Sequence, residues 1–559
     1  MKKNNKIIAL ITLLLGTFIA LMDTTIVNIA IPEMLDYFSC SLTEVSWVTT
    51  GYNLAFAVLL ITASRLADQF GRRKAFIFGV LLFTITSLLA GISTSIEMLI
   101  LFRVIQGLSA AFIVPVTMPI AIEIVPEEKK GLVIGIWGAF AGFAATLGPV
   151  LGGLLTEKFN WQSIFYINIP IGIVTILLSY YFIKESYDET ASKKIDYLGI
   201  FSLSVFLFCL TFAFAQVSDK GWTSSYILIL FAVSLLFGIL FILIESKVTE
   251  PMVPLKILKV KTFSFSSLTL FVLGLGLTSG TLIITLLLTT VMEQSELKAG
   301  LIVSTLALSS MVTSVFSGKL LDKLGGRWFS VIGMSALTVT TYLYGTIRYD
   351  SPISRIILLL CITGLAIGLV MGPAMGSSIR EIPEDKIGIA SGVVNMMRSV
   401  GQALGIAILA TILSSNITSN MDTSKQEAIS IIEKSRILDE AAKQEVIKSV
   451  KAGNVSGKSS NNQILDAIDV KEREILSKTP EQYKSKVKKS FEIQKKEILH
   501  LRSKITEVYN NNISDAFDYT FQVAGWIVSI GIVFAIFSDI SPARLRREKS
   551  QGTFHDAHY

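Results

Sequence analysis

Residues 21–32 of this 559-residue chain read LMDTTIVNIAIP and close an apolar run that begins near Ile7. The run is long enough to cross a bilayer, which takes roughly 20 helical residues. Asp23 lies inside it. A carboxylate at that depth costs about 2.5–3.5 kcal/mol on insertion scales, so we expect it to face protein or a wet cavity rather than lipid. Asp23 is then either a structural hydrogen-bonding group or a site that takes up a proton or a cation.

The composition is that of a polytopic membrane protein. The chain is 51% hydrophobic and only 17% charged, whereas soluble domains carry about 25% charged residues. Its apolar runs are continuous rather than alternating, so membrane helices are expected and a β-barrel is not. The net charge of +7 falls mostly in short loops, where Lys and Arg set topology, and does not indicate nucleic-acid binding.

The sequence gives no sign of an enzyme, a metal site or a cofactor. The three cysteines are scattered, without the spacing of a metal site or a disulfide framework. We find no P-loop, zinc motif or nucleophile elbow in a suitable context. No catalytic residue is therefore predicted.

Length and apolarity predict about fourteen membrane spans. Basic residues gather in the loops on one side, which places both termini in the cytoplasm by the positive-inside rule. The first run is too long for a signal peptide and no cleavage site follows it, so we expect an uncleaved first helix. The predicted spans are 7–31, 45–67, 75–93, 97–122, 132–155, 163–183, 197–216, 224–245, 263–291, 299–321, 329–347, 354–378, 388–414 and 518–540.

An internal repeat relates two halves of the chain. Residues 64–74 follow the second span and residues 318–327 follow the tenth, with Leu, Asp, Gly and Arg recurring in register. Pro126 and Pro383 open a second matched pair of loops. Both pairs are about 255 residues apart, as expected of a transporter built from parallel repeats. The two spans at 197–245 lie between the halves and are predicted to be an insertion.

The predicted organisation has five parts. Residues 1–190 form an N-terminal six-helix bundle, and residues 191–262 form two inserted helices with flanking cytoplasmic loops. Residues 263–414 form the first five helices of a C-terminal bundle, which residues 518–559 complete with the last span and a cytoplasmic tail. Residues 415–517 are polar and are expected outside the cytoplasm, with amphipathic helices around a break at 453–457. That segment is either a loosely ordered loop or a cap that binds an extracytoplasmic partner.

Five motifs occur in one order along the chain. They are the first-helix stretch 23–32, LADQFGRRK at 66–74, Arg103 with Gln106 and Gly107, GPVLGG at 148–153, and FYINIP at 165–170, with Trp47, Val48 and Tyr52 in addition. Together they resemble the major facilitator superfamily, specifically its fourteen-span drug:proton antiporters of the multidrug efflux type. The resemblance covers nearly all of the chain outside residues 415–517. It implies an all-α integral membrane fold in the cell membrane, with two six-helix bundles plus two inserted helices.

The resemblance makes Arg103 the partner of Asp23 in proton coupling. A neighbouring guanidinium favours the charged carboxylate, whereas loss of water favours the protonated form. Alternation between wet and dry surroundings would therefore load and release a proton. The sequence alone does not show that the two side chains touch.

The loop motif is predicted to form a conformational latch. Its carboxylate can accept hydrogen bonds from the N-terminus of a neighbouring helix, and its basic residues can pair with acids on neighbouring loops. The basic residues could instead only fix the orientation of the spans in the membrane. Ser64 and Gln69 stand where the family usually has Gly and Arg, so one cation of the latch is missing. The predicted latch residues are Asp68, Gly71, Arg72, Arg73, Asp322 and Arg327.

The GPVLGG segment lies within the fifth span. Proline bends a helix by removing a hydrogen bond, and glycine lets a neighbouring helix approach closely. Helix packing alone would explain such a segment, but the resemblance implies that it distinguishes exporters from importers. The residues concerned are Gly148, Pro149, Gly152 and Gly153.

A central substrate cavity is expected to have aromatic and flexible walls suited to lipophilic cations. The alternative for each lining residue is packing or contact with lipid. Arg398, on the thirteenth span, has no intramembrane acid in its half, so a structural role and an anion contact are equally open. The candidates are Met22, Asn28, Trp47, Tyr52, Asn53, Trp137, Phe140, Phe143, Asn395 and Arg398.

Three functions fit the sequence. The first is a proton-coupled exporter of a hydrophobic or cationic small molecule, with protons and membrane lipids as the other partners. The second is a transporter of a lipid or lipid precursor with the same fold. The third is a membrane sensor that does not transport and that uses residues 415–517 as a partner surface.

Overall fold

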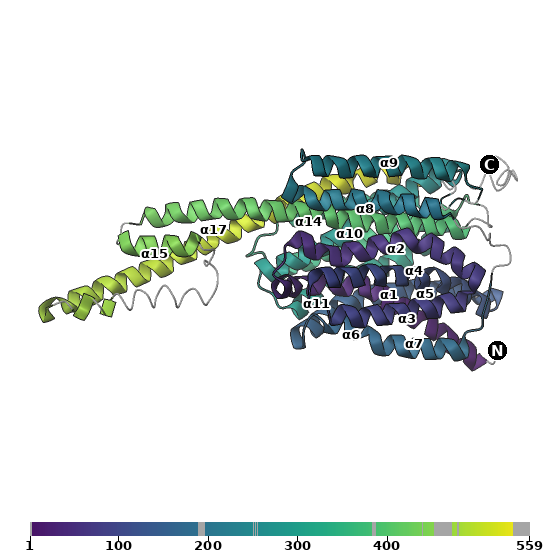
Figure 1. Ribbon diagram of the computed structural model, residues 1–559, viewed down its shortest axis with the longest axis horizontal. Helices are drawn as coiled ribbons and strands as arrows, with labels where there is room; N and C mark the ends of the chain where they lie inside the picture. Colours follow the sequence, from purple (N-terminus) through teal and green to yellow (C-terminus); the bar gives the residue numbers. More distant parts are fainter. Residues whose placement is uncertain are drawn as a thin grey trace. The chain divides into compact units, whose positions relative to one another are not determined.

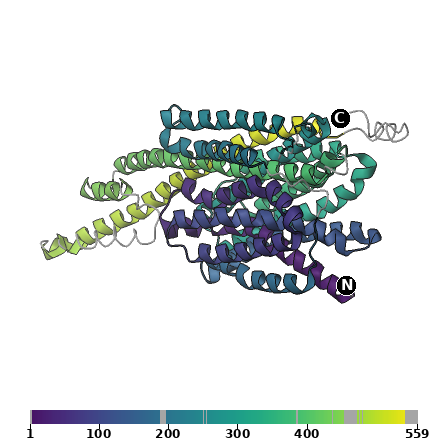
Figure 2. The same cartoon turned by 45° about the vertical axis from the view of Figure 1, so that its right-hand side comes forward.

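The computed structural model describes residues 3–187, 196–249, 251, 253, 255–382, 387–435, 437–438, 440–451, 472–473, 475–477 and 480–539, with most of their side chains. The chain divides into two compact units, one of Met1–Ser414 with Thr520–Tyr559 and one of Ser415–Tyr519. We call them the transport unit and the hairpin unit and describe each by itself. Long helices of the transport unit lie side by side (Figures 1 and 2).

The N-terminal half of the transport unit contains six spans. Helix α1 packs against α4, α5 and α7, and α4 also packs against α2 and α3. This arrangement puts α1 and α4 in the middle of the half. The helices are α1 (Lys3–Phe38), α2 (Leu42–Phe70), α3 (Arg72–Gly91), α4 (Ile96–Ile124), α5 (Glu127–Lys158), and α6 (Ser163–Tyr166) with α7 (Asn168–Phe182) as the sixth span.

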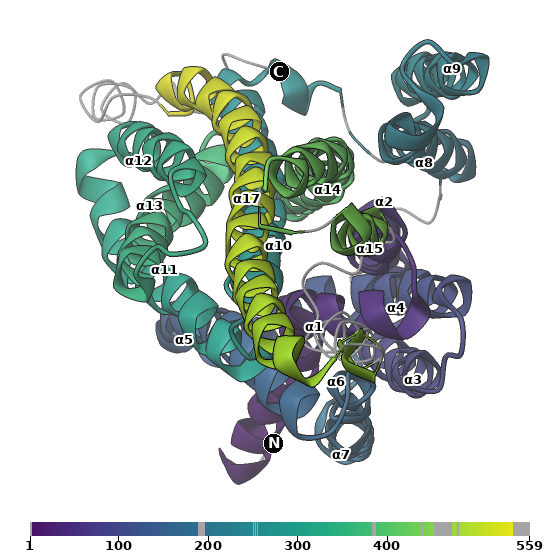
Figure 3. The same cartoon turned by 90° about the vertical axis from the view of Figure 1, so that its left-hand side faces the viewer.

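Two further helices, α8 (Tyr197–Lys220) and α9 (Ser225–Lys247), pack against each other and follow the first half. Only 11% of the apolar window of α9 is buried within the protein, so most of that helix is available to lipid. Helix α8 contacts α2, and Figure 3 shows the pair beside α2 and away from α12 and α13. The pair therefore joins the bundle at one edge.

The C-terminal half repeats the arrangement of the first. Helix α13 packs against α10, α11 and α12, and Gly401 and Gly405 of the next helix pack closely on the backbone of α10. The two halves meet where α5 contacts α11 and where α1 contacts α10. The elements are η1 (Ile257–Lys259), α10 (Lys261–Leu286) with η2 (Leu287–Val291), α11 (Glu296–Leu324), α12 (Arg327–Gly345), α13 (Ile353–Ile379), α14 (Ile387–Glu433) and α17 (Glu481–Ile536).

The predicted fold class is confirmed. Each of the fourteen predicted spans contains a helix, and twelve helical stretches among the described residues are long and apolar enough to cross a membrane. The largest difference lies in two helix ends. Helix α14 was expected to end at residue 414 but continues to Glu433, and α17 begins at Glu481 rather than near residue 518. Helical periodicity of apolar residues persists in both extensions, which explains their length.

The hairpin unit has an apolar core of its own. It consists of the later part of α14, α15 (Glu440–Lys451) and the earlier part of α17. Ala428, Ile432, Phe491, Ile498 and Ile505 are buried in one cluster. The predicted amphipathic faces therefore pack on each other, whereas the predicted break at 453–457 lies outside the described residues.

Candidate functional site

Asp23 on α1 and Arg103 on α4 form an ion pair inside the N-terminal half. Both side chains are completely buried, and Nη1 of Arg103 donates to Oδ2 of Asp23. Helix α1 contacts α4 along this stretch, which brings the two residues together across 80 positions of sequence. The carboxylate thus faces protein rather than lipid.

The other oxygen of Asp23 accepts two amide donors. Nε2 of Gln106 lies 3.4 Å from Oδ1, and Nδ2 of Asn168 lies 3.3 Å from the same atom. Asn168 also donates to Oγ of Ser87 on α3, 3.1 Å away. The carboxylate therefore has partners from α4 and α7, with α3 supporting one of them.

Arg103 has partners besides Asp23. Its Nε donates to the carbonyl oxygen of Val48 at 3.0 Å, and its Nη1 also donates to Oε1 of Gln106 at 2.7 Å. Its Cζ lies 4.4 Å from the ring centroid of Tyr52 and 5.7 Å from that of Phe165. We call Asp23, Arg103, Gln106, Asn168 and Tyr52 the Asp23 cluster.

These partners determine what the Asp23 cluster can do chemically. Removing one member of a buried ion pair usually leaves a costly uncompensated charge. Here two carbonyl-type oxygens and two aromatic faces remain on Arg103 if Asp23 is neutralised, and cation–π contacts are strongest where water is excluded. The cluster can therefore hold Arg103 in place in both protonation states of Asp23.

The GPVLGG segment packs α5 against two neighbours. A Cβ atom built on Gly148 would lie 2.0 Å from Oγ1 of Thr25, on α1 and two residues after Asp23. A Cβ atom on Gly153 would lie 2.3 Å from the carbonyl oxygen of Glu296, at the start of α11. Helix α5 is thus closely packed both on the helix that carries Asp23 and on the opposite half of the transport unit. Pro149 takes part as well, because its carbonyl oxygen would lie 2.1 Å from a Cβ atom on Gly300.

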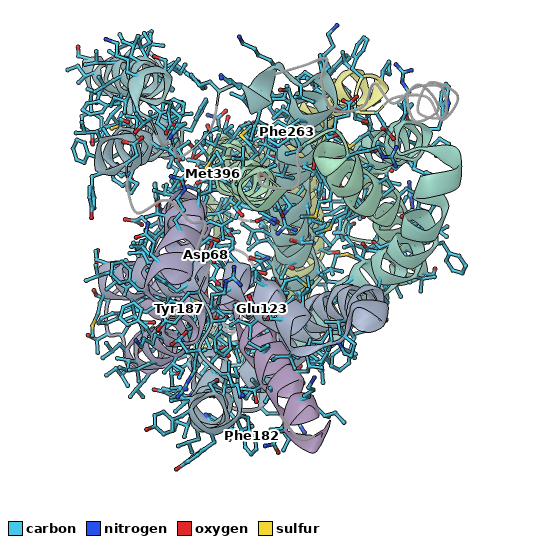
Figure 4. The ribbon with its side chains drawn as sticks, turned by 90° about the vertical axis from the view of Figure 1, so that its right-hand side faces the viewer. Asp68, Glu123, Phe182, Tyr187, Phe263 and Met396 are labelled. Carbon is cyan, nitrogen blue, oxygen red and sulfur yellow. The ribbon has the colours of Figure 1, made fainter. Side chains whose placement is uncertain are left out.

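The loop between α2 and α3 is held by acids from two other helix ends. Nε of Arg72 lies 2.7 Å from Oδ1 of Asp68, and Nη1 of Arg72 pairs with Glu123 at the end of α4. The backbone N–H of Arg73 donates to Oε1 of Glu185 at 2.9 Å, just beyond α7. Figure 4 looks onto the end of the unit where Asp68, Glu123 and Tyr187 are labelled. Arg72 and Arg73 therefore join the ends of α2, α4 and α7.

Gly71 is required by the shape of this loop. Its φ is +113°, and a Cβ atom would lie 2.6 Å from the carboxylate of Glu185. A side chain here would therefore strain the backbone and displace the acid.

The second half has a corresponding arrangement at its own loop. The backbone N–H of Gly326 donates to Oδ2 of Asp539, just beyond α17, and Arg327 donates through Nε to the carbonyl oxygen of Ile536. Asp539 also pairs with Nη1 of Arg380 at 3.0 Å. In each half, a carboxylate that follows the sixth span accepts a backbone hydrogen bond from the loop region before or at the start of the third span. The carboxylate is Glu185 in the first half and Asp539 in the second. The side chain of Asp322 lies outside the described part of the chain.

The predicted substrate residues do not gather in one place. Tyr52 is buried under Arg103, so it belongs to the Asp23 cluster. Trp47 packs on Phe208 and Phe212 of α8, with ring centroids 6.2 and 5.7 Å away. The ring of Phe140 is tilted against those of Phe18 and Phe143, with ring centroids 5.7 and 5.9 Å away. Tyr52, Trp47 and the touching pair of Phe140 and Phe143 thus lie among three different sets of neighbours.

Asn28 is the candidate that bridges the two halves. Its Nδ2 lies 3.5 Å from Oγ1 of Thr281 on α10, and its Oδ1 lies 3.5 Å from Oγ1 of Thr49. Met22 and Asn53 are buried, Phe143 is exposed, and Asn395 donates to the carbonyl oxygen of Ser391 on its own helix. Nε of Arg398 has no hydrogen-bond partner among the described residues, and the side chain of Trp137 lies outside them.

Comparison with known proteins assigns the family. Residues 13–406 match the sequence pattern of the Major Facilitator Superfamily. The chain belongs to this superfamily. It is therefore a multi-pass membrane transporter rather than an enzyme.

Superfamily members of known name share about three tenths of the matched residues. The tetracenomycin C resistance and export protein of Streptomyces glaucescens is 31% identical over 400 residues, which are 72% of this chain and 74% of that protein. The multidrug transporter protein MdtP of Bacillus subtilis (strain 168) is 29% identical over 413 residues, 73% of this chain and 75% of that one. The resemblance noted in the sequence is thereby confirmed.

Solved transporter structures share the fold. A bacterial homologue of the human lysosomal transporter Spinster matches with a TM-score of 0.60 at 14% identity, covering 96% of this chain and 97% of that one. A D-xylose–proton symporter matches with a TM-score of 0.51 at 13% identity, covering 73% and 90%.

Four contacts of this superfamily member were not predicted from sequence. Asn168 and Gln106 lay within quoted motifs, but nothing in the sequence linked their amides to Asp23. Ser87 lay in an ordinary apolar span, and the carbonyl of Val48 carries no sequence signal at all. A polar residue inside each of several apolar spans was the only available sign that these spans share a polar interior.

Proposed function

We propose that this protein is a proton-coupled exporter of hydrophobic or cationic small molecules, and that Asp23 carries the exchanged proton. The buried pair of Asp23 and Arg103 is the observation on which the proposal rests. A completely buried carboxylate in a membrane helix is costly, and such groups commonly mark ion or proton pathways. Both termini are cytoplasmic in this proposal.

The surroundings of Asp23 support a role in proton exchange. Three donors favour the charged carboxylate, from Arg103, Gln106 and Asn168. Complete burial favours the neutral acid. Movement of α1 relative to α4 or α7 changes the balance between these effects, so a conformational change can be coupled to uptake or release of a proton.

The packing of α5 links that chemistry to movement of the halves. Gly148 contacts Thr25 on α1, two residues from Asp23, and Gly153 contacts α11 in the opposite half. Rocking of the halves changes the α5–α11 contact and is transmitted to α1 through the same helix. Names of similar proteins, including resistance, export and multidrug transport, agree with outward movement of drugs.

Transport into inverted membrane vesicles under an imposed pH gradient tests the proposal, because export from the cell is measured there as uptake into the vesicle. We expect gradient-driven uptake of a lipophilic cation by the wild type and its loss in Asp23→Asn. Asp36→Asn is the matched control, because Asp36 lies on the same helix but is exposed. Equal gradient-driven transport by Asp23→Asn and the wild type would remove Asp23 from the coupling role.

The same vesicles separate the remaining functions. Uptake of a fluorescent phospholipid but of no soluble cation would identify a lipid transporter. Absence of transport for every compound, together with loss of a bound partner on removal of the hairpin unit, would identify a sensor.

A further inference from the structure

Arg398 on α14 is a cation within a membrane span, and no described group of the protein pairs with it. Its Nε is buried without a hydrogen-bond partner, and its side chain as a whole is only partly exposed. Among the described residues, no acid forms an ion pair with the guanidinium and no aromatic ring lies against it. The described protein groups therefore leave this charge uncompensated.

The sequence supplies no carboxylate at the depth of Arg398 in its own half. Arg398 lies near the middle of the predicted span 388–414, which contains no Asp or Glu. The other spans of this half lack acids as well, except that 518–540 has Asp518 and Asp539 near its two ends. A counter-charge for Arg398 must therefore come from outside these spans.

Arg103 shows how this protein holds an arginine that is fully satisfied. It pairs with Asp23, donates to the carbonyl oxygen of Val48 at 3.0 Å and lies 4.4 Å from the ring centroid of Tyr52. Arg398 has no such set of partners among the described residues. An arginine in a protein cannot lose its proton, and a charge removed from water is costly unless it is paired. An anion from solution or from the cargo would supply the missing partner.

The turn that carries Arg398 lies close to both halves of the transport unit. A Cβ atom built on Gly274 of α10 would lie 2.3 Å from the carbonyl oxygen of Arg398, so the two helices touch through their backbones. Nearer the start of α14, a Cβ atom on Gly392 would lie 3.2 Å from Cγ1 of Ile61 on α2. Side chains on a helix lean toward its N-terminus. Arg398 therefore leads toward the level at which α14 meets the N-terminal half.

We propose that Arg398 binds a monovalent anion between the two halves, either a carboxylate group of the transported compound or a free inorganic anion such as chloride. Both offer acceptors to a guanidinium whose Nε has none, and hydrogen bonds between charged groups are the strong ones. The first source rests on the proposed export function and narrows its cargo to hydrophobic compounds with an acid group. The second source offsets the charge of Arg398 when the cargo is a cation.

Equilibrium binding to the full-length protein in lipid nanodiscs at neutral pH tests the proposal. The probes are radiolabelled benzoate, its neutral counterpart benzamide, and radioactive chloride, with isethionate as the only other added anion. We expect benzoate, chloride or both to bind saturably, and Arg398→Gln to raise the Kd about tenfold or more, because a charged partner is lost. Arg398→Lys should raise the Kd less, since lysine keeps the charge but lacks the planar fork. Benzamide binding should not depend on Arg398.

Arg355→Gln is the matched control. Arg355 is exposed near the start of α13 and donates to Oγ1 of Thr346 at 2.6 Å. The Kd for each probe should be the same in this variant as in the wild type. Arg398→Gln removes a charge that has no described partner, so we expect it to fold, with an unchanged elution volume in size-exclusion chromatography.

The two anions distinguish the two sources. Benzoate binding that depends on Arg398 identifies the acid group of the cargo, whereas chloride binding that depends on Arg398 identifies a free anion. Binding of both shows a site open to either source. Kd values that Arg398→Gln leaves unchanged for both anions, or no saturable binding of either anion to the wild type, would overturn the proposal.

The outcome is distinct from that for proton coupling. Asp23→Asn should lose gradient-driven uptake but keep anion binding that depends on Arg398. If anion binding depends on Arg398 while wild-type transport ignores the pH gradient, the anion site stands and the proton-coupled function fails. Gradient-driven transport without anion binding at Arg398 would remove the site and leave the function in place.

Discussion

The Asp23 cluster depends on arginine, and no other cation fits its contacts. The guanidinium of Arg103 reaches Asp23, Gln106 and the carbonyl of Val48 in different directions while lying over the ring of Tyr52. A lysine has one compact charged group and lacks the planar fork that makes these contacts together. The Asp23 cluster therefore depends on the shape of the Arg103 guanidinium as well as on its charge.

Replacing Arg103 tests the strength of this pairing. We expect Arg103→Met to destabilise the protein by about 3–5 kcal/mol, because it leaves Asp23 buried without a counter-charge. Adding Asp23→Asn should recover much of the loss. The melting midpoint of the purified protein, followed by size-exclusion chromatography after heating, measures both effects.

Arg355→Met is the control for that experiment. Arg355 is exposed and donates to Oγ1 of Thr346 near the start of α13, so its loss should cost no more than about 0.5 kcal/mol. A midpoint for Arg103→Met equal to that of Arg355→Met would show that the buried pair contributes nothing to stability.

At the scale of elements, α5 is the helix that joins the two halves to Asp23. Its glycines face two different neighbours, with Gly148 and Gly152 on α1 and Gly153 on α11. The backbone N–H of Leu297 on α11 also donates a hydrogen bond to Oε2 of Glu157 on α5, 3.1 Å away. The close approach is possible only because these positions have no side chain.

Gly153→Ala should slow transport without unfolding either half. The added methyl would lie 2.3 Å from the carbonyl oxygen of Glu296 and 2.6 Å from Cα of Leu297, both backbone atoms. Overpacking of this kind costs about 1–3 kcal/mol and disfavours the state in which α5 and α11 touch. The rate of efflux into inverted vesicles measures the effect.

Gly372→Ala provides the comparison, because a Cβ atom there would come no closer than 3.6 Å to its neighbours. It should transport at the wild-type rate. If Gly153→Ala does the same, the α5–α11 contact has no part in the transport cycle.

The sequence predicted the elements well and their ends less well. Long apolar runs identified the spans, since a bilayer requires such runs whatever surrounds them. The continuity of α14 and α17 could not be predicted in this way. Amphipathic helices were expected within residues 415–517, but the polar character of 415–433 and 481–517 made them look separate from the neighbouring spans. The pairing of Asp23 with Arg103 came from resemblance, whereas the amides of Gln106 and Asn168 depend on how four helices rotate about their axes.

At the scale of the whole molecule, the two halves share a plan but differ in chemistry. The repeat of 254 to 257 residues was visible in the loops at Asp68 and Asp322. The difference at Arg103 was not, because sequence spacing does not show which residues of a span face inward. Leu360 stands 257 residues after Arg103, the same offset as between Pro126 and Pro383, so the buried cation of the first half is not repeated at that position.

The hairpin unit should be dispensable for transport. Its core residues all lie within Ser415–Tyr519, and every member of the Asp23 cluster lies in the transport unit. Nδ2 of Asn420 donates to the carbonyl oxygen of Asn512 at 2.7 Å, so α14 and α17 are adjacent there and a short Gly/Ser linker can replace residues 421–511. We expect this variant to keep efflux that is still lost with Asp23→Asn. A folded deletion variant that no longer transports would make the hairpin unit part of the transport machinery.

Proton release on ligand binding is the most direct test of the central claim that Asp23 exchanges a proton for cargo. Tetraphenylphosphonium is added to the purified, weakly buffered protein, and the pH change is followed with an indicator dye. The wild type and Asp36→Asn should release protons in proportion to the ligand bound, whereas Asp23→Asn should bind the ligand and release none. Equal proton release by Asp23→Asn and the wild type would contradict the account.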